Sequence, residues 1–127
     1  MSTVFAEPIN LGDLVKYEES TQAYSRDVVT VAPSQVLPLG TVVGMITSSK
    51  LIKALAPAAT DGSQNACGIL LHPVDTTQPG KHEALILARE SVVSEAYVAW
   101  PAGISVNDKD TATSQLKTLG ILIRQGA

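Results

Sequence analysis

The feature that most constrains this chain is a series of short apolar segments separated by turn-forming residues. In Arg26–Ala32, Val29 and Val31 share one face of an extended chain, which is the two-residue period of a strand. Glycine and proline residues lie between many of the later segments, and this punctuation is typical of strands joined by turns. We expect strands at Arg26–Ala32, Thr41–Ile46, Lys50–Leu55, Ala66–Leu71, Glu83–Arg89 and Ile121–Arg124.

One helix is predicted near the C-terminus, at Val106–Leu119. Ser105 can cap its first turn, with Asp108 three residues later as in a capping box. Apolar residues then recur at spacings of four and three, which gives the helix an apolar stripe. Gly120 suits the position that follows the last turn. The stripe consists of Ala112, Leu116 and Leu119.

These elements predict a mainly β fold of the α+β class. We expect a small, compact, β-barrel-like domain with one C-terminal helix followed by a last strand. A chain of 127 residues is the size of one domain, and 45% hydrophobic against 17% charged residues is a globular composition. Because aromatic residues make up only 4%, the core must be built from Val, Ile, Leu and Ala.

Residues 1–24 are predicted to form an extended N-terminal arm, flexible when free, that precedes a β-rich domain at 25–127. They contain small apolar islands without a sustained period of 2 or 3.6, so they predict no element that is stable alone. Residues 1–25 hold four acidic residues and one lysine, whereas residues 26–127 hold eight acidic and eight basic ones. The arm therefore carries the charge imbalance of the chain.

Charge and hydropathy argue against two classes of partner. We expect no nucleic-acid partner, because the Lys and Arg residues are scattered instead of clustered in a basic patch. We expect no membrane partner, because apolar runs such as Ala84–Ala88 are far shorter than a bilayer span. The chain begins without a signal-peptide pattern, and Cys67 has no partner cysteine. Synthesis in the cytoplasm is therefore expected.

The stretch "AATDGSQNACGILLH" (58–72) raises the question of an active site, since Cys67 and His72 resemble a nucleophile and its base. Residues an odd number apart on a regular strand face opposite sides, so they cannot form a dyad there. We expect Cys67 to share a face with Ile69 and Leu71 as a buried small hydrophobe. The dipeptide Asp61-Gly62 is typical of a turn, so the stretch predicts a turn that leads into a buried strand.

Metal and cofactor chemistry has equally little support in the sequence. His72, Asp75 and His82 could approach one another across a loop, but no cysteine-based or helix-based ligand spacing accompanies them. Asp108 and Asp110 alternate as in a calcium loop that lacks its glycine, and helix capping explains them better. No nucleophile elbow, phosphate loop or dinucleotide fingerprint occurs. We predict no catalytic residue, no metal and no cofactor.

Six stretches in a fixed order carry a resemblance to a known family. They are YSRDVVTVA (24–32), LGTVVGMIT (39–47), AATDGSQNACGILL (58–71), ARESVV (88–93), VAWPAGI (98–104) and QLKTLGI (115–121). The first 24 residues are similar as well, with EP at 7–8 and GDLV at 12–15. Together they resemble the bacteriophage head decoration proteins, the type that cements lambda-like heads. Each stretch alone is mostly turn and core residues, but the ordered set covers nearly the whole chain.

This resemblance implies a structural protein, not an enzyme. It implies a homotrimer at the local threefold positions of an expanded phage head, on the outer surface of the virion. There it would bridge major capsid proteins and resist the pressure of packaged DNA. It also implies that the arm contacts the capsid, and Ile9 and Leu11 suit addition of a strand to a capsid edge. The expected capsid-binding residues are Val4, Phe5, Pro8, Ile9, Leu11, Leu14 and Val15.

Two other functions stay open at this point. One is a small β-barrel module that binds a ligand, receptor or glycan, although the scarcity of aromatic residues argues against glycan stacking. The other is a small metal hydrolase that uses His72, Asp75 and His82. Trp100, the only tryptophan, would anchor either the domain core, which we favour, or a subunit interface.

Overall fold

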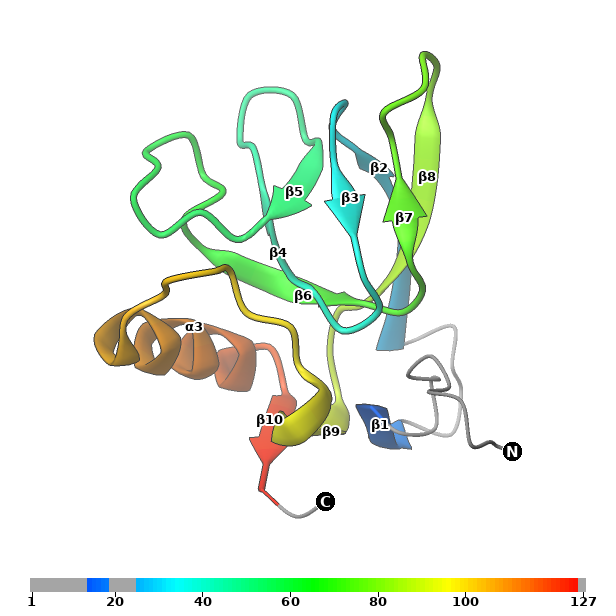
Figure 1. Ribbon diagram of the computed structural model, residues 1–127. Helices are drawn as coiled ribbons and strands as arrows, with labels where there is room; N and C mark the ends of the chain where they lie inside the picture. The colour runs from blue at the N-terminus through cyan, green and yellow to red at the C-terminus, as the bar shows by residue number, and fades with distance from the viewer. Residues whose placement is uncertain (1–13, 19–24, 126–127) are drawn as a thin grey trace, which may run out of the picture.

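The computed structural model describes residues 14–18 and 25–125, and a closed five-stranded β-barrel forms its centre (Figure 1). Its spatial order is β2-β5-β4-β6-β8. β2 pairs antiparallel with β8, from Arg26 opposite Leu87 to Val31 opposite His82, and its parallel pairing with β5 closes the barrel. The expected mainly β, barrel-like fold is confirmed. The barrel strands are β2 (Arg26–Val31), β4 (Val42–Met45), β5 (Ile52–Ala54), β6 (Ala66–Leu70) and β8 (His82–Leu87).

A second layer, made of a three-stranded sheet and the helix, packs against one side of the barrel (Figure 1). The sheet has the order β1-β9-β10, and its central strand β9 is antiparallel to β1 and parallel to β10. Its strands are β1 (Val15–Glu18), β9 (Ser91–Ser94) and β10 (Ile121–Arg124), and the helix is α3 (Val106–Thr118). The remaining elements are the pair β3 (Val36–Leu37) and β7 (Val74–Asp75) and the 3-10 turn η1 (Glu95–Tyr97).

Neighbouring residues in the barrel wall belong to two different hydrophobic cores. Val43 and Leu70 belong to the inner core, within the barrel, whereas Val42 and Ile69 belong to the outer core, between the barrel and the second layer. Because both faces of these strands are buried, their sequences are continuous apolar runs. The outer core also includes Leu116 of α3, which attaches the helix to the barrel.

The helix begins where its sequence predicts and ends one residue earlier, at Thr118 instead of Leu119. Ser105 Oγ accepts a hydrogen bond from the backbone N–H of Asp108 at 3.1 Å, and Gly120 has a φ of +90° just beyond the helix. Ala112 and Leu116 of the predicted stripe are buried. Leu119 is the exception at 38% exposed, because the helix has already ended and the chain turns toward β10 there.

Strands β1, β3, β7 and β9 were not among the predicted strands. β3 and β7 have two residues each, which is too short for a recognisable period. A turn in which Glu90 has a φ of +48° ends the strand predicted at Glu83–Arg89. β9 begins directly after this turn as a separate strand. β1 falls within the predicted arm, and it places Val15 opposite Val93 of β9. In the described part of the chain, no helix has the length and apolar character needed to cross a membrane.

Candidate functional site

The seven residues predicted to bind a capsid fall into two groups. Leu14 directly precedes β1 and Val15 is its first residue, and both are described by the structure. The others lie outside the described residues, so their role stays a prediction. They are Val4, Phe5, Pro8, Ile9 and Leu11.

Leu14 belongs to the core of the domain. Its side chain is 0% exposed and lies in the outer core, the same cluster that contains Leu116 and Ile121. Val15 packs partly buried against that core and pairs with Val93 of β9. A side chain packed in this way is not available to a partner surface. Leu14 is therefore part of the domain core, whereas Val15 keeps part of its surface exposed.

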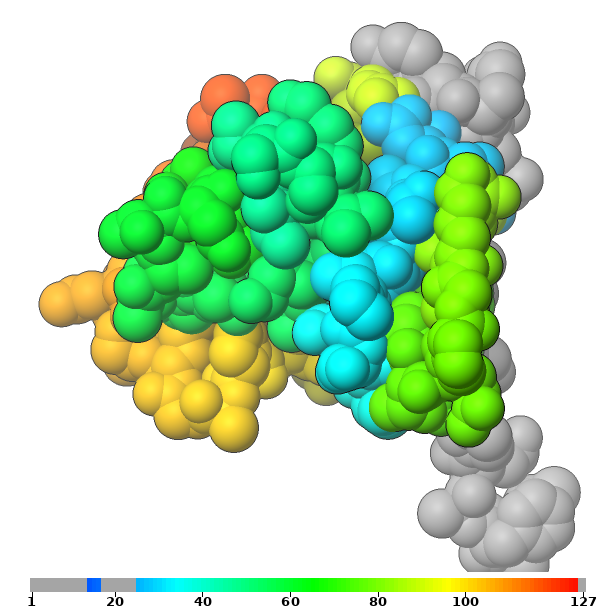
Figure 2. Space-filling view, turned by 90° about the horizontal axis from the view of Figure 1, so that it is seen from above, coloured from blue at the N-terminus to red at the C-terminus, as the bar shows by residue number. Residues whose placement is uncertain are grey.

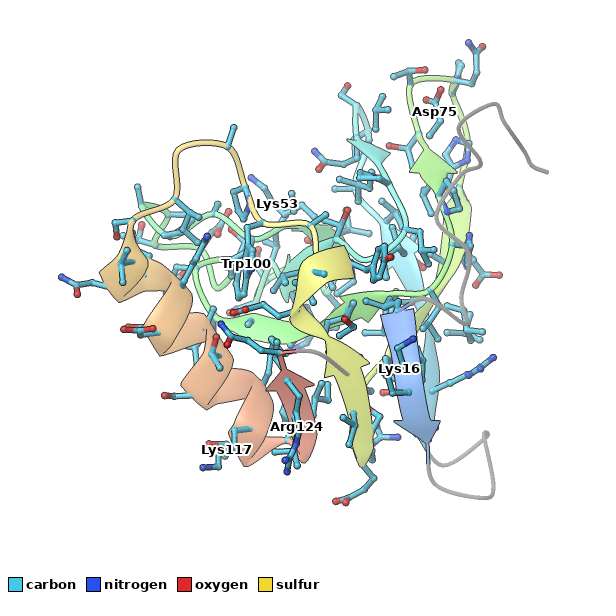
Figure 3. The ribbon with its side chains drawn as sticks, turned by 60° about the horizontal axis from the view of Figure 1, so that its bottom comes forward. Lys16, Lys53, Asp75, Trp100, Lys117 and Arg124 are labelled. Carbon is cyan, nitrogen blue, oxygen red and sulfur yellow. The ribbon has the colours of Figure 1, made fainter. Side chains whose placement is uncertain are left out.

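The sheet that receives β1 has two edges. β1 forms one edge and β10 the other, with β9 between them. An edge strand directs a row of backbone N–H and C=O groups away from its sheet, where another extended segment can pair with them. A groove of about 640 Å³ lies along β10 and is lined on its other side by Thr113 and Lys117 of α3. Arg124, the last residue of β10, lies near Lys117 on this side of the molecule (Figure 3).

A second groove, of about 620 Å³, lies at one end of the barrel. Val29, Met45 and Ile86 line it and pack in or against the inner core, which gives the groove an apolar floor. Asp27 and Arg89 also line it and form an ion pair at 2.7 Å. Because its floor is apolar and its two charged residues already pair with each other, this groove is suited to an apolar group.

Cys67 lines this second groove, and its predicted orientation is wrong. Successive residues of β4 pair with Gly68 and Ala66, so Cys67 is the extra residue of a β-bulge. The bulge interrupts the alternation of side chains, and Cys67 packs against the inner core while Ile69 and Leu71 lie in the outer core. Burial raises the pKa of the Cys67 thiol to about 11, so at neutral pH it is a protonated, weak nucleophile.

The side chains of the candidate metal trio are engaged in separate local contacts. His72 Nε2 accepts a hydrogen bond from the backbone N–H of Leu85 at 3.0 Å, and His82 Nε2 lies 2.9 Å from a backbone carbonyl oxygen. The hydroxyl and backbone N–H of Thr77 both donate to Asp75, which lowers the pKa of that carboxyl. Within residues 14–18 and 25–125, no group of three His, Cys, Asp or Glu side chains is placed to hold a metal ion.

Trp100 lies between the core and the surface. It packs partly buried against the outer core and also lines a hollow of about 160 Å³ with Val36 and Pro101. Val36 is 69% exposed, so an apolar surface continues outward from the tryptophan. The variant Trp100→Ala, measured for folding and for oligomeric state, separates the core role from the interface role.

The groove along β10 and the Asp27–Arg89 ion pair were not predicted from the sequence. The signal for the ion pair was present, because antiparallel pairing of the predicted strands at 26–32 and 83–89 brings the start of one next to the end of the other. The groove had no such signal, since it depends on how α3 lies against β10. Figure 2 shows the molecule from above, where the barrel segments (cyan to green) lie beside the helix region (yellow to orange).

Among known protein families, the family model described as bacteriophage lambda head decoration protein D matches residues 4–121 of the 127-residue chain. The match extends from the residues that precede β1 to the first residue of β10. No curated protein matches the chain.

Proposed function

Because the chain belongs to the bacteriophage lambda head decoration protein family, we propose that it cements a phage head as a homotrimer. Membership of this family makes it a phage capsid decoration protein with a structural role. The proposal adds that trimers bind at local threefold positions on the outer surface of an expanded head and resist the pressure of packaged DNA. The family match over residues 4–121 is the observation that carries it.

The architecture suits a protein that must stay folded under mechanical load. A closed barrel leaves no free strand edge within its own sheet. Strands β4 and β6 of its wall are packed on both faces, one in the inner core and one in the outer core, so local opening there would expose apolar surface to water on two sides.

The partner in this proposal is the major capsid protein, and the arm makes the contact. The burial of Leu14 ties the base of the arm to the domain, which leaves residues 1–13 to reach the capsid. Ordering a free segment costs about 1–2 kcal/mol per residue, so a single arm would bind weakly. Three arms on one trimer would act together through a high effective concentration.

We propose no nucleic-acid or membrane partner and synthesis in the host cytoplasm. The net charge of −3 and the scattered basic residues disfavour attraction to the phosphate backbone of nucleic acids. We therefore expect it to bind the proteins of the head and not the packaged DNA.

Cosedimentation with expanded, undecorated phage heads tests the proposal. We expect the full-length protein to bind at saturating threefold stoichiometry and to raise the temperature at which the heads break. A protein lacking residues 1–13 should stay folded, because Leu14 is retained, and should bind poorly. Val28→Ala, which changes a side chain that is 67% exposed on β2, is the matched control and should bind as the unmodified protein does. Failure of the full-length protein to bind would refute the cementing role.

The acidic character of the arm gives a second test of the same contact. If the capsid presents a basic groove to the arm, the affinity should fall as ionic strength rises. An affinity that is the same at low and high salt would show that electrostatic attraction does not contribute, and that the apolar residues are the source of affinity.

A further inference from the structure

The loop between β5 and β6 (Figure 1) contains a chemically labile dipeptide, Asp61-Gly62. In such a pair, the backbone nitrogen of the glycine can attack the side-chain carboxyl carbon of the aspartate. The new nitrogen–carbon bond closes a five-membered succinimide ring, and the amide proton and the carboxyl hydroxyl leave as one water molecule. Water then opens the ring at either carbonyl, which gives back aspartate or gives isoaspartate, whose main chain runs through the former side chain. Glycine favours the attack because it has no side chain to hinder the approach.

The fold requires the glycine of this labile pair. Gly62 has a φ of +109°, a conformation that residues with a side chain rarely adopt. A Cβ atom at this position would lie 2.6 Å from the carbonyl oxygen of Met45 and 2.9 Å from the backbone nitrogen of Thr47, closer than such atoms approach in folded proteins. The loop therefore depends on a residue that also makes its backbone reactive.

The turn holds the groups that would react. The N–H of Thr47 donates a hydrogen bond to the carbonyl oxygen of Asp61 at 2.8 Å. The N–H of Gly62 donates to Gln64 Oε1 at 2.8 Å, so the peptide group between Asp61 and Gly62 is hydrogen-bonded at both ends. Asp61 Oδ1 accepts from the backbone N–H of Ser63 at 3.0 Å and also from its hydroxyl. Ring closure requires the carboxyl group and the peptide plane to rotate relative to each other, and these four bonds restrict both rotations.

The charge of the Asp61 carboxyl acts in the same direction. The hydrogen bonds from Ser63 lower the pKa of this carboxyl, so it stays ionised to a lower pH than an aspartate in an unfolded chain. Ring closure proceeds from the protonated acid, because a carboxylate is a poor electrophile. The contacts that restrict the rotation of the side chain therefore also keep it in its less reactive form.

We propose that Asp61-Gly62 is a site of isoaspartate formation and that Ser63 and Gln64 suppress the reaction in the folded protein. The reaction then proceeds only while the turn is locally open. Isoaspartate adds one carbon to the main chain, which would displace the carbonyl oxygen that bonds Thr47 and prevent the turn from closing again. The inference concerns the free subunit and does not depend on the proposed cementing role.

Prolonged incubation of the full-length protein at mildly acidic pH tests the site. Isoaspartate at residue 61 is measured by peptide mapping and by methyl transfer from a protein-isoaspartate methyltransferase. We expect the folded protein to form it at least about tenfold more slowly than the same chain in guanidinium, because more than one hydrogen bond must break first. Asp61→Glu, which would have to close a six-membered ring, is the negative control and should give none. Equal rates in the two states overturn the protection, and a guanidinium-unfolded chain without isoaspartate overturns the site itself.

Two variants test the residues that are proposed to suppress the reaction. Gln64→Ala removes the acceptor of the Gly62 N–H, and Ser63→Ala removes one donor to Asp61. Each should raise the rate in the folded protein by about fivefold, the effect of one hydrogen bond, whereas Gln78→Ala, in another exposed loop, should leave it unchanged. Unchanged rates in both variants overturn the role of these side chains.

Amide hydrogen exchange separates a local opening of the turn from a general loss of stability. In Gln64→Ala, exchange of the Gly62 N–H should become faster while exchange in β6 stays as it is in the unmodified protein. If exchange in β6 also becomes faster, Ser63→Ala, which removes a single oxygen atom, decides the matter. A rate of isoaspartate formation in Ser63→Ala equal to that of the unmodified protein then overturns the proposal.

Discussion

Leu14→Ala should destabilise the domain itself, although residue 14 belongs to the predicted arm. Leu14 is 0% exposed and shares the outer core with Leu116 of α3 and Ile121 of β10. Truncation of a fully buried leucine to alanine costs about 2–5 kcal/mol, depending on how far the surroundings collapse into the cavity. Because Leu14 precedes an edge strand that can adjust, we expect about 3 kcal/mol. For a chain of this length, that corresponds to a fall of roughly 10 °C in Tm.

Urea unfolding followed by circular dichroism measures the effect, at one fixed protein concentration because assembly stabilises the folded subunit by mass action. Val28→Ala, at a position that is 67% exposed, is the control and should change the free energy of unfolding by less than about 0.5 kcal/mol. The protein lacking residues 1–13 should show an unfolding transition like that of the full-length subunit. A loss below about 1 kcal/mol for Leu14→Ala would refute the assignment of Leu14 to the core.

Three further predictions concern the domain. Ser105→Ala should cost about 1 kcal/mol of stability in urea unfolding, because it removes the oxygen that caps α3 at Asp108 N–H; an unchanged midpoint would contradict the cap. The hydroxyl of Ser63 donates to Asp61 and lowers the pKa of that carboxyl. The ionised carboxylate therefore stabilises the fold above its ordinary pKa, and this stabilisation is lost as the pH falls through the lowered pKa. Asp61→Asn should therefore flatten the acid end of the stability profile below about pH 4, and a profile identical to that of the unmodified protein would exclude this link. The Cys67 thiol, with its pKa raised to about 11 by burial, should react slowly with a disulfide reagent at pH 8 and rapidly once urea unfolds the chain; fast reaction of the folded protein would show that the thiol is accessible.

The sequence predicted those elements whose conformation depends mainly on residues close to them in the chain. The cap at Ser105 and the positive φ at Gly120 depend on contacts within a few residues, so the ends of α3 can be read from the chain. Strands β4 and β6 were recognisable as apolar runs because both of their faces are buried, and β2 was recognisable from its alternation. The order of the matching stretches likewise predicted the family that the comparison of residues 4–121 confirmed.

Errors arose where a partner far away in the sequence decides the conformation. The alternation of residues 66–71 predicts the wrong face for Cys67. The bulge that turns it to the other face arises only from the pairing of β4 with β6. Leu14 and Val15 form no period of their own, and they belong to the domain only because β9 provides an edge for β1. Leu119 continues the apolar stripe in sequence, but the helix ends before it.

The sequence by itself determined the class of fold, the helix and its ends, the uneven charge of the first residues and the family. These depend on period, composition and turn chemistry, which act over a few residues. Only the tertiary structure decided that Leu14 is buried, which core each residue of β4 and β6 faces, and that β10 is an edge among the described strands with Lys117 and Arg124 beside it. The physical reason is that burial and strand pairing are relations between distant segments, and no local pattern records which segments will meet.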